Sequence, residues 1–179
     1  MKKLILRVAI VCLLSSVGAA AADSHIEVLK FNIGDDWKTV GHSDTGSGHS
    51  IRYIRDGDDI NHWKETFTYL FGVRRRGLRP PEKEFSTLEA DTEKQWPGLT
   101  DWNVIAKDED SILYEWHMKW SARTHEECNI SRIIHTKYNW FTLLYVARVH
   151  ELAPDTRAQW IKILSDATVS TDSSATPAH

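Results

Sequence analysis

The stretch 112-ILYEWHMKW-120 decides the fold class of this chain. Apolar side chains occupy every second position: Ile112, Tyr114, Trp116, Met118 and Trp120. Between them lie the polar residues Glu115, His117 and Lys119. This period of two predicts a strand with one apolar face and one polar face. It is the clearest strand in the sequence, and the neighbouring elements are found by working outward from it.

Further strands lie on both sides of this stretch. A polar turn over 121–127 leads into a strand over 128–135, and another strand starts at Trp102. The segment 140–149 is apolar on both faces, which predicts a central strand. Short links between successive strands require antiparallel neighbours, because parallel strands need long crossovers.

Alternation also predicts three earlier strands, over 37–43, 50–55 and 63–73. Pro80-Pro81 then opens a helix that runs to Trp96, and a last helix begins at Pro154. The order β-β-β-α-β-β-β-β-α predicts an α+β domain, with an antiparallel sheet of about six to seven strands flanked by two main helices.

These elements form a single domain over 37–169. We expect a lead-in over 23–36, where Ile26, Val28 and Leu29 can add a short strand, and a flexible polar tail over 170–179.

Residues 1–22 have the pattern of a secretory signal peptide: a basic start, an apolar run and a small-residue end. Ala20 and Ala22 fit the two small positions before a cleavage site, which would leave a mature chain of 157 residues. Loss of three cationic side chains takes the formal net charge from −3 to −6. We therefore expect a periplasmic or secreted monomer, with no nucleic-acid partner and no stable membrane insertion after cleavage.

The leader and the element order together resemble the PsbP-like domain, an α/β/α sandwich of thylakoid-lumen and bacterial periplasmic proteins. The resemblance covers most of 37–169, with a helix over 81–96 before the strands of 110–149 and a closing helix from Pro154. It implies a binding or scaffolding role, since such domains generally lack a shared catalytic site. It carries no particular residue over to this chain.

The densest charge is the cluster Arg74, Arg75, Arg76 and Arg79, between the third strand and the first helix. Planar guanidinium groups bind phosphates and carboxylates bidentately, so these residues are the candidate site for an anionic partner. The alternative interpretation is a solvated loop, paired with the acidic helix that follows.

Eight tryptophans are unusual for this length, and two interpretations stay open. They can line a cleft for a sugar, a peptide or a quaternary amine, or they can fill the core of a sheet-and-helix sandwich. Trp63, Trp116, Trp120 and Trp140 fall within predicted strands, and Trp160 falls on a helix stripe.

Catalytic and metal signatures are absent from the sequence. Glu126 and Glu127 next to Cys128 disfavour a reactive thiolate. Seven histidines show no HxH, HxxxH or HExxH spacing: His42, His49, His62, His117, His125, His135 and His150. Counting from Asp56, the twelfth position of a calcium loop is Phe67 instead of glutamate. We therefore expect no catalytic residue, no metal and no cofactor.

The sequence thus favours an exported, non-enzymatic binding or scaffolding domain that recognises a protein or a small ligand. A periplasmic immunity or inhibitor protein against a toxin is a second reading. From a different class, the alternative is a small periplasmic hydrolase that uses Glu115, His117 or Cys128.

Overall fold

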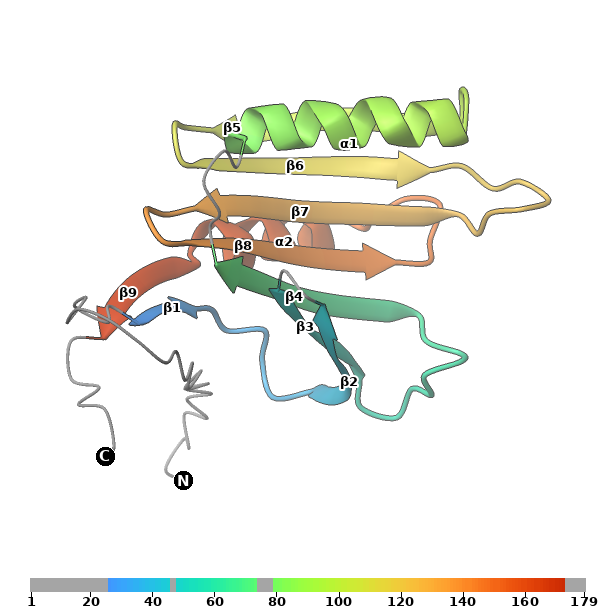
Figure 1. Cartoon of the computed structure of the whole chain (residues 1–179). Coiled ribbons are helices and arrows are strands. Elements are labelled where there is room, and N and C mark those ends of the chain that lie inside the picture. Colours follow the sequence, from blue (N-terminus) through green and yellow to red (C-terminus); the bar gives the residue numbers. More distant parts are fainter. Residues whose placement is uncertain (1–25, 46–47, 74–78, 173–179) are drawn as a thin grey trace.

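The computed structural model describes residues 26–45, 48–73 and 79–172, and in this part the chain forms two antiparallel sheets and two helices (Figure 1). The larger sheet has seven strands in the order β2-β3-β4-β8-β7-β6-β5, and the smaller pairs β1 with β9. The elements are β1 (Ile26–Lys30), β2 (Trp37–Thr45), β3 (Gly48–Arg55), β4 (Glu65–Val73), α1 (Pro81–Gln95), β5 (Thr100–Lys107), β6 (Ser111–Met118), β7 (Glu127–His135), β8 (Asn139–Ala147), α2 (Pro154–Ser165) and β9 (Thr168–Asp172).

The predicted α+β class, the antiparallel sheet and the element order are confirmed. β8 is the fourth of the seven strands and pairs with β4 on one side and with β7 on the other. The segment that is apolar on both faces therefore occupies the centre of the sheet, because only a central strand buries both of its faces.

The two helices cover opposite faces of the sheet. Tyr114 of β6 contacts Phe85 of α1, whereas the next residue, Glu115, contacts Arg157 of α2. Successive side chains of a strand point to opposite faces, so this pair of contacts assigns one helix to each face. Figure 1 shows α1 along β5 and β6, and α2 behind β7 and β8.

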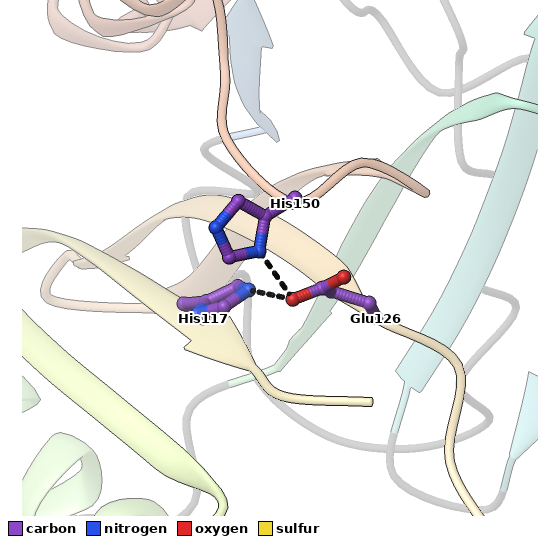
Figure 2. Close-up of side chains that lie close together, drawn as sticks. All are labelled: His117, Glu126 and His150. Carbon is purple, nitrogen blue, oxygen red and sulfur yellow. Dashed lines mark hydrogen bonds and ion pairs between the residues drawn. The ribbon is translucent and has the colours of Figure 1, made fainter. Parts of the chain in front are cut away.

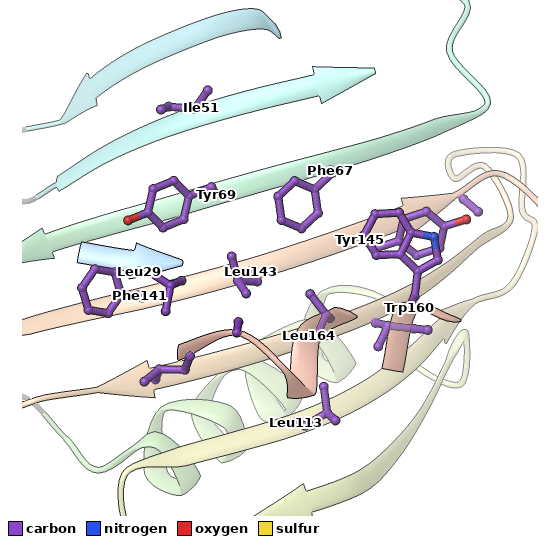
Figure 3. Packing of buried hydrophobic residues seen from close by; sticks show 14 residues of the cluster. Leu29, Ile51, Phe67, Tyr69, Leu113, Phe141, Leu143, Tyr145, Trp160 and Leu164 are labelled. Carbon is purple, nitrogen blue, oxygen red and sulfur yellow. The ribbon is translucent and has the colours of Figure 1, made fainter. Parts of the chain in front are cut away.

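The main core lies on the α2 face (Figure 3). Trp160 of α2 is 1% exposed and stacks on Tyr145 and Phe67, with ring centroids 4.1 and 5.6 Å apart. A second, smaller cluster on the other face joins Phe85 of α1 to Ile112, Tyr114 and Ile133. For Trp160 the core interpretation of the tryptophans is confirmed.

Two tryptophans predicted within strands lie just outside them. Trp63 precedes β4, because the preceding turn extends to Lys64, whose backbone N–H donates to the Asp58 carboxylate. Trp120 follows β6, because the chain turns where Ser121 and Thr124 exchange backbone hydrogen bonds. Trp120 is 70% exposed, so the expectation that it shares the apolar face was wrong.

The described fold also extends beyond the expected 37–169 boundary. Val28 and Leu29 belong to β1, as the lead-in allowed, and residues 168–172 form β9, where the flexible tail was expected from 170. Val169 pairs with Leu29 in this small sheet and packs against the core. A single apolar residue in a small polar segment is too weak a signal to predict a strand.

Candidate functional site

A cleft opens on the α2 face, beside the helix. α2 contacts β7 and reaches β8 and β4 through Trp160, whereas α1 lies over β5, β6 and β7 on the opposite face. The helices are therefore offset, and the α2 face of β5 and β6 extends beyond α2. The cleft has a volume of about 340 Å³. It is lined by Asp101, Trp102, Asn103, Glu115, Trp116, His117, Cys128, Asn129, His150, Glu151, Leu152 and Arg157.

An ion pair between Arg157 and Glu115 spans one side of the cleft. Nε and Nη2 of Arg157 donate to the two oxygens of Glu115 at 2.7 and 2.8 Å, and Asn103 donates to Glu115 Oε1 at 2.8 Å. These hydrogen bonds, with that of Arg157 first, lower the pKa of Glu115. Arg157 lies in the first turn of α2, where the helix dipole favours acidic residues over cations. The ion pair with Glu115 offsets this unfavourable position.

Three titratable side chains converge at the rim of the cleft (Figure 2). His150 Nδ1 lies 2.6 Å from Glu126 Oε1, and His117 Nε2 lies 3.3 Å from the same oxygen. The ligand atoms of the three residues all lie within 4.8 Å of one another. The hydrogen bond between His150 and Glu126 raises the pKa of His150 and lowers that of Glu126.

Each member of this cluster comes from a different element. His117 is in β6, Glu126 directly precedes β7, and His150 lies in the loop between β8 and α2. We refer to His117, Glu126 and His150 as the rim cluster. Its members are separated by 9 and 24 positions in the sequence, so no short motif announces it.

Cys128 lies on the wall of the cleft, opposite His117 in the β6–β7 register. Its thiol donates weakly to the backbone oxygens of Val149 and His150, each at 3.5 Å. Burial raises its pKa, and the nearby carboxylates of Glu126 and Glu115 add to the effect. The expectation of a disfavoured thiolate is confirmed, with burial as the larger cause.

The predicted binding loop falls largely outside the described residues, which exclude Arg74, Arg75 and Arg76. Arg79 is described and exposed, and its Nη1 donates to Thr87 Oγ1 of α1 at 2.8 Å. The anionic-partner site therefore stays a prediction. The cleavage positions Ala20 and Ala22 also lie outside the described residues.

Two other candidates from the sequence have structural explanations. His117 and His135 do not meet across the β6–β7 hairpin: His135 pairs with Trp140 of β8, is buried, and bonds to Glu84 of α1 at 3.0 Å. The acidic residues after β3 shape a turn, in which Asp58 accepts the backbone N–H of Lys64 and Asp59 that of Asn61.

The sequence reasoning missed the rim cluster, although part of its signal was present. His117 was assigned to the polar face of its strand. A hairpin over 112–135 also brings the residues around Glu126 close to His117, so this half of the cluster was within reach of the sequence pattern. The place of His150 depends on the path of the loop between β8 and α2, which the sequence pattern does not specify.

No protein-family model matches the chain, and no curated protein sequence matches it. Among solved structures, LpqN of Mycobacterium tuberculosis is similar, with a TM-score of 0.52 and 13% sequence identity over 83% of this chain and 86% of that chain. LpqN is described as involved in cell envelope biogenesis. At this identity the likeness shows a shared fold. In the described part of the chain, neither helix has the length and hydropathy needed to cross a membrane.

Proposed function

We propose that this protein is an exported, non-enzymatic binding domain of the cell envelope, which holds a small ligand in the cleft beside α2. The observation that carries the proposal is the cleft itself. Its volume of about 340 Å³ lies at the lower end of the range typical of small-molecule sites.

The polar groups of the cleft are fixed before any ligand arrives. Arg157 and Asn103 hold the Glu115 carboxylate from two sides, so these groups lose little conformational freedom when a ligand binds. Leu152 adds an apolar side chain to the lining, whereas the rings of Trp102 and Trp116 stack on each other and pack against the cluster of Phe85 and Tyr114 on the α1 face. Fixed polar groups beside an apolar wall are the usual composition of a ligand site.

The chemistry of the same residues supports binding over hydrolysis. A nucleophilic cysteine needs a depressed pKa, whereas the pKa of Cys128 is raised. A general base needs a free carboxylate with a pKa near neutrality, whereas Glu115 is paired with Arg157 and its pKa is lowered. Two of the three residues that a small hydrolase would use are thus poorly suited to that role.

Export and a role in the envelope are supported by two further observations. The first 22 residues have the composition of a secretory signal peptide. The fold is similar to that of LpqN, which is described as involved in cell envelope biogenesis. The resemblance to PsbP-like domains favours the same kind of role, binding or scaffolding.

Native mass spectrometry of the protein recovered from its own cell envelope tests this proposal. We expect a mature chain that begins at Asp23 and carries a bound small molecule. Leu152→Trp adds bulk to the wall of the cleft and should remove that bound mass. Lys162→Trp places the same side chain on an exposed position of α2 outside the cleft and should retain it.

Circular dichroism of both variants checks that the fold is intact. Binding in the cleft would be contradicted if the wild type carries no bound small molecule, or if both variants carry the same bound mass. An intact N-terminus on protein recovered from the cytosol would contradict export.

A further inference from the structure

The rim cluster has the composition and convergence of a metal site. We propose that His117 Nε2, Glu126 Oε1 and His150 Nδ1 bind one zinc ion at the rim of the cleft. This inference goes beyond the proposed function, because it concerns an inorganic ion and does not depend on an organic ligand.

The chemistry of the three groups selects the class of metal. Two imidazole nitrogens and one carboxylate oxygen form a protein ligand set that is well known for zinc, with the fourth position left to water or to another ligand. Magnesium and calcium prefer oxygen ligands throughout, so two imidazoles argue against them.

The spacing of the ligand atoms fits after a small adjustment. Zinc bonds of about 2.0–2.1 Å place neighbouring ligand atoms of a tetrahedral site about 3.3 Å apart. His117 Nε2 and Glu126 Oε1 already lie at 3.3 Å. His150 Nδ1 lies at 2.6 Å from the same oxygen and must move outward by less than the length of a bond.

The residue that must move is the one free to do so. The side chain of His150 is 81% exposed, on a loop, whereas that of His117 is 22% exposed and fixed on β6. Two ligands are therefore already placed at the spacing that zinc requires, and the third can adapt without strain in the sheet.

An independent observation also points to a ligand at this position. His117 Nε2 is buried and makes no hydrogen bond of good geometry within the described residues, although it lies near the Glu126 carboxylate. A buried polar atom without a well-formed hydrogen bond is costly. Coordination to zinc would satisfy this nitrogen.

Two neighbouring carboxylates and the neighbouring thiol are already engaged. Glu127 pairs with Arg148 at 3.4 Å, and Asp101 pairs with Lys119 at 3.0 Å. The thiol of Cys128 is held by two backbone oxygens. The rim cluster therefore supplies three protein ligands, and His117 and His150 also line the cleft.

Isothermal titration of the chelator-treated protein with zinc chloride tests the proposal. We expect one zinc per chain and an increase in thermal stability upon binding, since an ion that binds the folded state alone stabilises it. His150→Ala and Glu126→Gln should each weaken the affinity by about tenfold or more. Both changes are near the surface, and circular dichroism should show an unchanged fold.

His62→Ala is the matched control, because His62 is an exposed histidine outside the cluster and also lies beside a carboxylate, that of Asp59. It should bind zinc as the wild type does, and magnesium and calcium should not compete. The proposal would be contradicted if the wild type does not bind zinc, or if His150→Ala and His62→Ala bind zinc with equal affinity. The rim cluster would then be an ion pair without a metal. The titration uses zinc alone, so its outcome neither supports nor contradicts the binding of an organic ligand in the cleft.

Discussion

Nη1 of Arg132, on β7, donates to the backbone oxygen of Leu164 in the last turn of α2 at 2.8 Å. The same nitrogen lies 3.0 Å from the oxygens of Ser165 and Ala167. The last carbonyls of a helix lack partners within it, and a cation is favourable at this end of the helix dipole. Arg132 thus fastens the end of α2 to the sheet and helps to define the helix position that leaves the cleft open.

Replacement of Arg132 by methionine should destabilise the fold, because three backbone oxygens lose their charged donor. We expect a loss of about 2–4 kcal/mol in the free energy of unfolding, measured in urea. Arg52→Met, at an exposed position of β3, is the control and should change it by less than about 0.5 kcal/mol. Equal urea midpoints for the two variants would contradict the role given to Arg132.

The Trp160 side chain should dominate the core energetically, since it is 1% exposed and stacks on Tyr145 and Phe67. Trp160→Ala should cost about 3–5 kcal/mol of unfolding free energy. Trp120→Ala, at a side chain that is 70% exposed, should cost less than about 0.5 kcal/mol. Similar losses in the two variants, again measured in urea, would be inconsistent with this core.

The ion pair between Glu115 and Arg157 should make stability depend on pH. Because the pKa of Glu115 is lowered in the folded state, the pair stabilises the protein above the ordinary glutamate pKa. That stabilisation is lost as the pH falls through the lowered value. We expect Glu115→Gln to cost about 1 kcal/mol at neutral pH and less in acid.

The measurement is urea unfolding of the wild type and the variant at neutral and at acidic pH. Glu109→Gln, at an exposed carboxylate in the β5–β6 turn, serves as the control. A difference between wild type and Glu115→Gln that stays constant with pH, or grows in acid, would refute the assigned sign.

The thiol of Cys128, which is half-buried, should react less readily than that of a free cysteine peptide. Its raised pKa predicts that the rate of alkylation by iodoacetamide, followed against pH, has its midpoint above that of a free cysteine peptide. Mass spectrometry of the modified chain gives the rate. A midpoint below that of the peptide would restore Cys128 as a candidate nucleophile and favour the hydrolase interpretation.

The sequence predicted the parts of the fold that local patterns encode. Alternation along 112–118 and the apolar run of β8 identified strands and the centre of the sheet, because burial of one or both faces leaves a direct record in the residues. Trp120 was placed inside the strand that ends at Met118, because the end of a strand depends on turn contacts that alternation does not record. Strand β9 was missed, because Val169 has too few apolar neighbours to form a pattern.

The candidate site was predicted only in part. The polar face that carries Glu115 and His117 was visible, and the raised pKa of Cys128 was anticipated from its acidic neighbours. The pairing of Glu115 with Arg157 and the approach of His150 to Glu126 join residues 42 and 24 positions apart. Such contacts are set by tertiary packing of α2 and its preceding loop, which a local pattern does not specify.

The most direct test of the binding cleft is the rate at which iodoacetamide alkylates Cys128, with and without a small-molecule extract of the cell envelope. Cys128 lines the cleft and is the one cysteine outside the proposed signal peptide, so modification of the mature chain reports on that wall alone. A ligand held in the cleft should slow the reaction several-fold. An unchanged rate over increasing amounts of extract would contradict the claim that the cleft binds an envelope ligand.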